Sequence, residues 1–389
     1  MRSKTMAPNT ASLKIGLVLD TSLDTSEGVP QYVLTIGEWL RSQGHNVHYL
    51  VGQSSRRDVA NVHSLARNIR VRFNGTNTTI PLPANRRKLR SFIKTENFDI
   101  IHVQVPHHPL MAQHLILAAE PQTAVIGTFH ILPYGRLSRG GTKALGAWLR
   151  PSLKRFDRML AVSEAAAEFC QASFGIKADV LPNVINYPRF HDAKPFPAYT
   201  DSKLTVLFLG RLVARKGCGL LLEAVAKLTK DPELPPFRVL VCGKGHLLPK
   251  LEQYVNHHGL KDIVTFTGFV SEADKPRYYA SADLAVFPSS GGESFGIVLL
   301  EAMSSGHAAV LAGDNPGYRS VVAPQPKLLF NPHRADELAE KLAYYLVENK
   351  QRQQMADWGS DYTRNFDVAI VGAQLLNIYH QALHKRRQQ

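Results

Sequence analysis

Short apolar runs alternate with longer segments of helical periodicity along almost the whole chain. This alternation is typical of α/β proteins, in which helices connect the strands of a parallel sheet. Many of the runs end at a glycine or a polar residue, where α/β proteins place their ligands. We predict strands at Lys14–Leu19, Asn46–Val51, Asp99–Val105, Ala124–Phe129 and Arg158–Val162, and then at Leu204–Leu209, Phe237–Cys242, Ile263–Thr267, Leu284–Phe287 and Ala308–Leu311.

The length of 389 residues indicates two domains, since single hydrophobic cores rarely exceed about 250 residues. Between the two groups of strands, the segment from Tyr187-Pro188 through Pro195-Phe196-Pro197 is rich in proline and lacks periodicity, as linkers do. The predicted organisation is a disordered extension at 1–13, an N-terminal domain at 14–190, a linker at 191–203, a C-terminal domain at 204–366 and a terminal helix at 367–389.

Composition excludes several classes of protein. A hydrophobic fraction of 44% is ordinary for a globular chain, and no run approaches the roughly 18 apolar residues of a membrane span. Residues Met1–Ser12 lack the apolar core of a signal peptide. Cys170, Cys218 and Cys242 are widely spaced without a metal-ligand pattern. They are expected to be reduced core thiols of a cytoplasmic protein.

The net charge of +14 implies an anionic partner, either nucleic acid, a phosphorylated substrate or an anionic membrane. No recognition motif and no basic stripe interleaved with aromatic residues supports nucleic acid. The turn after the first strand also lacks the Gly-x-Gly-x-x-Gly of dinucleotide-dependent dehydrogenases. The anionic partners that remain as candidates are a phosphorylated substrate and a membrane surface.

The most informative motif runs from Gly291-Gly292-Glu293-Ser294-Phe295-Gly296-Ile297 to Glu301 at the start of an apolar helix. Its glycines allow a ligand to approach the backbone closely, and the free N–H groups of the first helical turn attract phosphate. Glu301 could accept hydrogen bonds from two vicinal hydroxyls, as a ribose offers, while Glu293 could face another part of the same ligand. Alternatively, Glu293 caps the helix and Glu301 is solvated.

This motif resembles the paired-glutamate motif of retaining glycosyltransferases of family 4 with the GT-B fold, and it is most similar to that of bacterial phosphatidyl-myo-inositol mannosyltransferases. The resemblance extends over nearly the whole chain from about Lys14. It implies an α/β architecture of two Rossmann-like domains facing a central cleft. The nucleotide-sugar donor would bind the C-terminal domain, the acceptor would bind the N-terminal domain, and a C-terminal helix would cross back to the N-terminal domain.

The donor site is expected at several strand ends of the C-terminal half. Gly210 and Arg211 follow one strand directly, and Lys216 comes shortly after. Cations there would stabilise the departing nucleoside diphosphate, and the resemblance gives Arg211 and Lys216 this role. The open alternative is that both are solvated surface residues. The resemblance adds further donor contacts at Gly243, Ser294, Phe295, Gly296, Ile297 and Glu301.

Val270, Glu272 and Lys275 resemble the segment that holds the nucleobase in this family. A carboxylate at Glu272 could accept the N1–H and the amino group of guanine, which favours GDP-mannose over a UDP-sugar, although Glu272 could equally be solvated. No Asp-x-Asp motif stands where a strand would present it. We therefore expect no metal cofactor, with Lys, Arg and helix N-termini in its place.

In the N-terminal half, Gly28 matches a backbone contact to the donor, whereas Glu27 stands where the family usually has a second glycine. Gly127-Thr128-Phe129-His130 ends a strand and resembles the Thr-Phe-His of the mannosyltransferases. This likeness implies that His130 contacts the transferred sugar, positioning and polarising it rather than acting as a general base. With Arg211, Lys216 and Glu293, His130 completes the predicted catalytic set.

Acceptor residues are harder to carry over, because the chain has Thr21, Pro30 and Thr79 where the inositol-lipid enzymes have Tyr, Gln and Arg. Because of these departures, the prediction that the acceptor carries an inositol headgroup stays open. The predicted donor chemistry is not affected. The acceptor-binding residues that we predict are Thr21, Asn74, Arg136 and Ser138.

A basic segment precedes the third predicted strand of the N-terminal half. At 100° per residue, Arg86, Arg87, Arg90 and Lys94 gather on one face of a helix, opposite Leu89, Phe92 and Ile93. The simplest interpretation is a surface helix packed on its domain. The gathered cations also suit an anionic bilayer, which attracts each of them with about 1 kcal/mol, and the similar lipid mannosyltransferases have a basic helix here.

The sequence thus predicts a retaining, metal-independent glycosyltransferase that moves a hexose, mannose from GDP-mannose, to a membrane lipid acceptor such as a phosphatidylinositol-type glycolipid. The alternative is a soluble family 4 enzyme that uses a UDP-sugar and a small sugar or sugar phosphate. For the protein as a whole, the expected partners are a nucleotide-sugar, a lipid or sugar acceptor and an anionic membrane surface, with no nucleic acid. It is expected in the cytoplasm, peripheral at the inner face of the plasma membrane.

Overall fold

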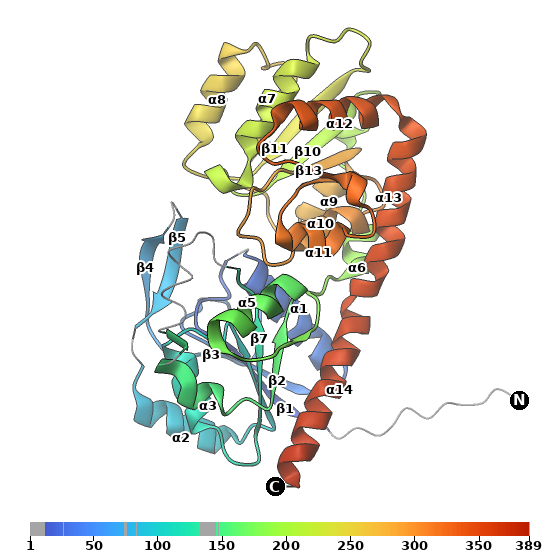
Figure 1. The fold of residues 1–389 in the computed structure, drawn as a ribbon. Helices are drawn as coiled ribbons and strands as arrows, with labels where there is room; N and C mark the ends of the chain where they lie inside the picture. The colour runs from blue at the N-terminus through green and yellow to red at the C-terminus, as the bar shows by residue number, and fades with distance from the viewer. Residues whose placement is uncertain are drawn as a thin grey trace, which may run out of the picture.

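The computed structural model describes residues 12–25, 27–73, 76–82, 84–132, 145–146 and 148–388. Two parallel sheets, each flanked by helices, lie one above the other, with the N-terminal sheet at the bottom of Figure 1. Their adjoining ends face one another across the middle of the molecule. The predicted α/β fold of two Rossmann-like domains is confirmed.

The first sheet is parallel throughout, in the order β3-β2-β1-β6-β7-β8-β9. Its central strands β6 and β7 are buried along their whole length, which explains why they are apolar runs without alternation. Helices cover both faces of this sheet, among them α1 (Gly28–Ser42), α2 (Arg86–Glu96), α3 (Met111–Ala118) and α5 (Glu164–Phe174). The strands are β1 (Lys14–Leu19), β2 (Asn46–Val51), β3 (Val62–Ser64), β6 (Ile100–Gln104), β7 (Ala124–Phe129), β8 (Arg158–Ala161) and β9 (Asp179–Val180).

An antiparallel hairpin of β4 (Asn68–Phe73) and β5 (Thr76–Pro81) stands apart from this sheet. It was not predicted. In Figure 1 it projects upward at the left edge of the N-terminal half, toward the C-terminal half.

The second sheet has the order β12-β11-β10-β13-β14-β15 and is also parallel. Every strand predicted in this half is present within two residues of its expected bounds, and β15 is additional. The strands are β10 (Leu204–Leu209), β11 (Phe237–Cys242), β12 (Val264–Gly268), β13 (Leu284–Phe287), β14 (Ala309–Gly313) and β15 (Leu329–Phe330). The helices are α7 (Cys218–Leu228), α8 (Leu248–His257), α9 (Lys275–Ala280), α10 (Ile297–Ser304), α11 (Pro316–Val322) and α12 (Ala335–Val347).

The chain passes between the two halves twice, and the two crossings are hydrogen-bonded to each other. Ile185 donates from its backbone N–H to the carbonyl of Phe366 at 3.0 Å and accepts from the N–H of Val368 at 2.8 Å. The Asp367 carboxylate accepts from the N–H of Tyr187 at 2.9 Å. The proline-rich segment around the predicted linker is partly helical: α6 (Tyr187–His191) ends where the linker was predicted to begin, and a 3₁₀ turn at Pro197–Tyr199 lies within the linker. Prolines in the first turn of each favour this local structure.

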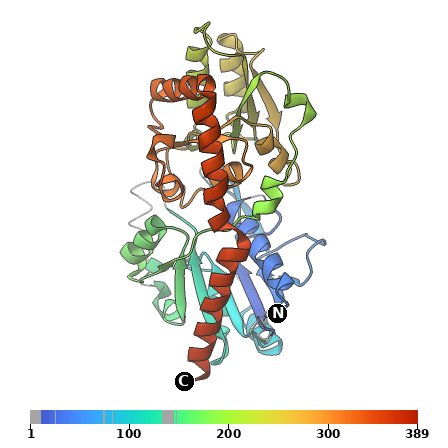
Figure 2. The same ribbon diagram turned by 90° about the vertical axis from the view of Figure 1, so that its right-hand side faces the viewer.

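After α13 (Asn349–Thr363), the second crossing leads into α14 (Val368–Arg387), which runs down the N-terminal half (Figure 2). Helix α14 is built into the core of the first sheet. Leu375 and Tyr379 are completely buried, and the Tyr379 hydroxyl lies 2.7 Å from Nδ1 of His102 on β6. Gly372 packs so closely on Trp39 of α1 that a Cβ atom there would lie 2.6 Å from the indole ring. The predicted crossing of the C-terminal helix is therefore confirmed.

Helix α2 has the two-sided character that its sequence predicts. Leu89 and Ile93 are buried, and Phe92 is half-buried against the same core cluster. The four basic residues Arg86, Arg87, Arg90 and Lys94 are all exposed. Among the described residues, none of the helices is both long and apolar enough to cross a membrane.

Candidate active site

A cavity of about 840 Å³ lies between the two halves. It is formed where the carboxyl ends of strands from both sheets face each other, the edge at which parallel α/β sheets bind ligands. The structure brings every predicted catalytic and donor-binding residue to this one cavity. These residues are Gly28, His130, Gly210, Arg211, Lys216, Gly243, Val270, Glu272, Lys275, Glu293, Ser294, Phe295, Gly296, Ile297 and Glu301.

Glycine is required where the backbone segments lining the cavity meet. Gly243, directly after β11, has φ of +152°, and a Cβ atom there would lie 1.8 Å from the carbonyl oxygen of Gly210. Only glycine permits this approach of two strand ends. Gly296 has φ of +134° and precedes the first turn of α10. The turn that presents Glu293 and Ser294 to the cavity therefore depends on glycine.

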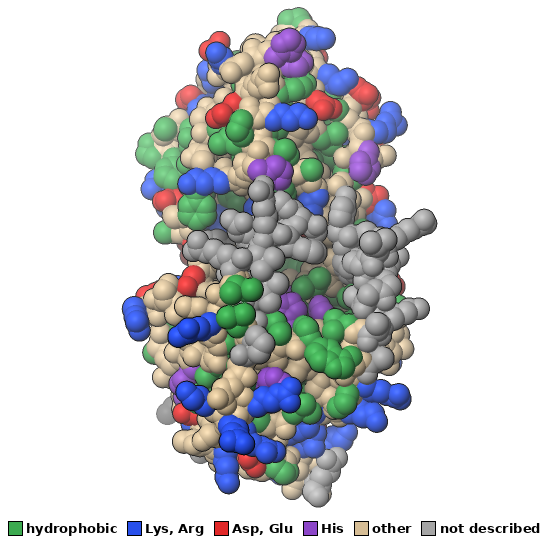
Figure 3. Space-filling view, turned by 90° about the vertical axis from the view of Figure 1, so that its left-hand side faces the viewer, with side chains coloured by type: hydrophobic (Ala, Val, Ile, Leu, Met, Phe, Trp, Pro, Cys, Tyr) green, Lys and Arg blue, Asp and Glu red, His purple; other side chains and the backbone are tan. Residues whose placement is uncertain are grey.

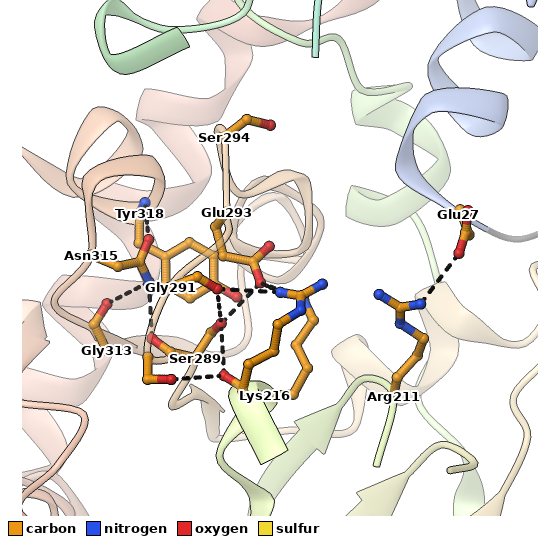
Figure 4. A network of polar contacts seen from close by, with 12 residues as sticks. Glu27, Arg211, Lys216, Ser289, Gly291, Glu293, Ser294, Gly313, Asn315 and Tyr318 are labelled. Carbon is orange, nitrogen blue, oxygen red and sulfur yellow. Dashed lines mark hydrogen bonds and ion pairs between the residues drawn. The ribbon is translucent and has the colours of Figure 1, made fainter. Parts of the chain in front are cut away.

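Glu293 is held by two cations at the floor of the cavity (Figure 4). Its Oε1 atom lies 2.9 Å from Nζ of Lys216 and 2.5 Å from Nη1 of Arg215, and it also accepts from Oγ of Ser289 at 2.9 Å. Burial raises the pKa of Glu293, but Lys216 and Arg215 outweigh burial and bring the pKa to about 2. Glu293 is thus a fixed anion near neutral pH, and its side chain is only 14% exposed.

Glu301 forms a second buried ion pair further along the cavity. Its Oε1 atom lies 2.7 Å from Nζ of Lys275, and its Oε2 atom accepts from the Tyr279 hydroxyl at 3.1 Å. Lys275 also lies 2.9 Å from Glu272. Burial lowers the pKa of Lys275, but the two carboxylates outweigh burial and raise it. Lys275 therefore links Glu272 to Glu301 as a permanent cation.

His130 closes the cavity from the N-terminal half. Its Nε2 atom lies 2.7 Å from Oε1 of Gln104, so this nitrogen carries the proton when the ring is neutral. Its ring packs edge-on against Tyr32 with centroids 4.8 Å apart. Burial lowers the pKa of His130 to about 3, and the imidazole is neutral near pH 7. A neutral, oriented ring fits the predicted positioning role better than that of a proton carrier.

Arg211 reaches across the cavity to the other half of the molecule. Its Nη1 atom lies 3.3 Å from Oε1 of Glu27, the residue before α1 (Figure 4). Ser294 makes a second link, donating from Oγ to the backbone carbonyl of His130 at 2.5 Å. Both halves therefore contribute to one continuous site.

Several lining residues were not predicted as site residues. Arg215 is next to Lys216 and could have been chosen from that position alone. Lys244 and Phe269 are likewise next to the predicted Gly243 and Val270, whereas Asn183 and Gln31 carry no local signal, because only the tertiary structure brings them to the cavity. Of the predicted acceptor residues, Thr21 does not line the cavity, and Asn74, Arg136 and Ser138 lie outside the described residues.

The cavity is suited to a phosphorylated ligand. The first turns of α1 and α10 both line it, so two sets of free backbone N–H groups face the same space as Arg211 and Lys216. Within the described ranges, no group of three or more His, Cys, Asp or Glu side chains could hold a metal ion.

Comparison with known proteins identifies the family. Residues 26–189 match the family model "Glycosyltransferase Family 4", and residues 192–360 match the model "Glycosyl transferases group 1". A phosphatidyl-myo-inositol mannosyltransferase of Mycolicibacterium smegmatis is 32% identical over 371 residues, covering 94% of this chain and 93% of the relative. The chain belongs to glycosyltransferase family 4. A relative of the same name from Mycobacterium tuberculosis is 30% identical and covers 94% of the chain and 96% of its own length.

Solved structures of other glycosyltransferases agree with the fold of this family 4 enzyme. One from Rickettsia africae has a TM-score of 0.75 at 18% identity, covering 96% of this chain and 99% of that one. Anabaena HepE in complex with UDP has a TM-score of 0.72 at 18% identity, covering 95% of this chain and all of HepE. The chain is a glycosyltransferase with the GT-B fold.

Proposed function

We propose that this glycosyltransferase transfers mannose from GDP-mannose to a membrane lipid acceptor of the phosphatidylinositol type, with retention of configuration and without a metal ion. The observation that carries the proposal is the convergence of Arg211, Lys216, Glu293, Glu301 and His130 on one cavity. The relatives named phosphatidyl-myo-inositol mannosyltransferases, similar over nearly their whole length, support the choice of sugar and acceptor.

For the donor, the proposed arrangement places the ribose at Glu301, the diphosphate between Arg211, Lys216 and the helix N-termini, and the sugar between Glu293 and His130. Glu272 favours guanine, because its carboxylate lines the cavity next to the proposed ribose site. Arg189 also contacts Glu272, at 3.5 Å between side chains. A UDP-sugar is the alternative, favoured by the UDP in the similar HepE structure.

The proposed chemistry depends on the positive charges of Arg211 and Lys216. Arg211 and Lys216 stabilise the leaving diphosphate, the role that a metal ion has in other transferases. The depressed pKa of His130, about 3 because of burial, makes this ring a poor proton acceptor. In the reaction that we propose, the leaving phosphate itself accepts the proton of the acceptor hydroxyl on the same face of the sugar, which gives retention.

For the acceptor, we propose that α2 docks the enzyme on an anionic membrane. Arg86, Arg87, Arg90 and Lys94 are exposed together on this helix. The neighbouring α3 leaves Leu117 56% exposed, which could add an apolar contact to the electrostatic one. Figure 3 views the side of the molecule that carries α2 and shows Lys and Arg side chains over its lower half. The proposed location is the cytoplasmic face of the membrane.

A transfer assay tests the proposal. The purified protein is incubated with labelled GDP-mannose or UDP-glucose and vesicles that contain phosphatidylinositol, and the lipid product is analysed for its sugar and anomeric configuration. We expect an α-mannosyl lipid from GDP-mannose only. Transfer from UDP-glucose to a soluble sugar phosphate, with none to lipid, would establish the alternative.

A further inference from the structure

The ion pair between Glu27 and Arg211 occupies the place where the donor diphosphate is proposed to bind. Both side chains line the cavity, and Nη1 of Arg211 lies 3.3 Å from Oε1 of Glu27. Glu27 comes from the N-terminal half and Arg211 from the C-terminal half, so the pair spans the cavity (Figure 4). The cation proposed to bind diphosphate is therefore already neutralised by a carboxylate of the same chain.

The environment of Glu27 differs from that of Glu293, the other carboxylate paired with a proposed diphosphate-binding cation. Glu293 is 14% exposed and is fixed by Lys216, Arg215 and a hydrogen bond from Ser289. The Glu27 side chain is 52% exposed, and although it precedes α1, it makes no capping hydrogen bond to that helix. Glu27 can thus leave Arg211 by rotation of its own side chain. Glu293 cannot leave Lys216 in this way, because both buried charges would lose their ion pair.

We infer that Glu27 is an intramolecular competitor of the diphosphate, holding Arg211 when no nucleotide is bound and releasing it when the donor enters. The inference rests on the proposed function, since it requires that Arg211 bind a nucleoside diphosphate. A diphosphate carries more charge than one carboxylate and also gains the N–H groups at the start of α1 and α10. It therefore displaces Glu27, but at a cost in affinity.

Glu27 would affect both ends of the catalytic cycle. It weakens binding of the donor, and it equally weakens binding of the nucleoside diphosphate product, because the displaced carboxylate stays near the phosphates and repels them. Its return to Arg211 favours departure of the product. Glu27 is thus a residue that sets nucleotide affinity without contacting the nucleotide favourably.

The test is a titration of GDP and of UDP into the wild-type protein, Glu27→Gln, Arg211→Gln and the double variant at low ionic strength. An exposed ion pair changes an equilibrium by up to about fivefold, so Glu27→Gln should lower the Kd of the preferred nucleotide about three- to fivefold. In the Arg211→Gln background, the same change should have much less effect. Asp24→Asn is the matched control: this carboxylate also lines the cavity, but Ser54 and Ser55 of its own half hold it, at 2.6 and 2.9 Å.

The outcomes separate the inference from the proposed function. If the wild type binds a nucleotide and Glu27→Gln binds it equally or more weakly, the inference is wrong while the proposed function stands. An equal gain with and without Arg211 would also overturn it, since Glu27 would then act through the general field of the site. If neither nucleotide binds the wild type or any folded variant, the proposed donor site fails, and the inference fails with it. Thermal melting of each variant verifies folding.

Discussion

The Oγ atom of Ser294 donates a hydrogen bond to the backbone carbonyl of His130 at 2.5 Å, joining the motif of the C-terminal half to the strand end of the N-terminal half. The carbonyl of Ser294 in turn accepts from Oγ of Ser163 at 2.5 Å, so this residue bonds to the opposite half in both directions. Because Glu293 is the preceding residue, its position relative to His130 is fixed by these bonds. These two hydrogen bonds therefore join the two halves at the site.

Arg211→Ala or Lys216→Ala should nearly abolish transfer. Each change removes positive charge from the proposed diphosphate position, which should cost about 3–4 kcal/mol of transition-state stabilisation, or more than a hundredfold in kcat. Lys227→Ala, which removes an exposed lysine paired with Asp336 away from the cavity, is the control. Steady-state assays measure the effect, and near-normal turnover of the Arg211 variant would exclude that residue from the mechanism.

Activity should persist in EDTA, because Arg211, Lys216 and the helix N-termini supply the charge that a metal would otherwise provide. The measurement is transfer from GDP-mannose before and after chelation, and then after addition of Mg²⁺ or Mn²⁺. Loss of activity on chelation, with recovery on adding either ion, would refute metal independence.

The two glutamates of the motif should differ in what they contribute. Glu301→Gln should weaken binding of the free nucleoside diphosphate, because its carboxylate is proposed to hold the ribose and also pairs with Lys275 at 2.7 Å. Glu293→Gln should leave that binding nearly unchanged and depress turnover instead, since it is proposed to act on the sugar. Calorimetry with nucleotide and turnover with the full donor separate the two effects. The same defect in both assays for both variants would contradict the assignment.

Replacing Arg86, Arg87, Arg90 and Lys94 by Gln should reduce binding to anionic vesicles and transfer to a lipid within them. Hydrolysis of the donor in solution should be spared, because α2 contributes no residue to the cavity. Binding should weaken steeply with salt, as the screening length is only about 10 Å at 0.1 M.

A matched variant keeps this test of α2 specific. It loses the same number of charges from exposed positions of the C-terminal half, namely Lys227, Lys230, Lys250 and Lys261. Vesicle co-sedimentation should distinguish the two variants. Equal binding of both would show that α2 is an ordinary solvated helix and would favour the soluble-acceptor alternative.

His107→Phe should make the protein more resistant to acid. His107 is buried between Phe129 and Phe174, and burial lowers its pKa to about 3. An unfolded imidazole takes up a proton near pH 6.5, so below that pH the unfolded state binds more protons and the free energy of unfolding falls. The variant should lose about 2 kcal/mol less between pH 7 and pH 5. Denaturant unfolding at the two pH values measures this, with the exposed His257→Phe as control, and equal losses in variant and wild type would contradict it.

Where a local signature exists, the sequence predicted both fold and site. Strand ends such as Leu209-Gly210-Arg211 combine an apolar run, a glycine and a charge, and all three can be recognised in the amino-acid sequence. Short elements had no such signature: β9 and β15 have two residues each, too few to show a pattern. The side chains that contact the site residues could also not be predicted from the sequence. Gln104 meets His130 because β6 and β7 are neighbours in the sheet, and Glu27 meets Arg211 across 184 positions of sequence.

The path of α14 bears on what proteolysis can do to this enzyme. A cut in the segment between α6 and β10 would leave one fragment with the first sheet and another with the second sheet and α14. That helix buries Val371, Leu375, Tyr379, Ala382 and Leu383 in the core of the first sheet, so the fragments would remain one particle held by a helix of 20 residues. The nicked enzyme should elute with the intact chain in gel filtration and separate only in denaturant.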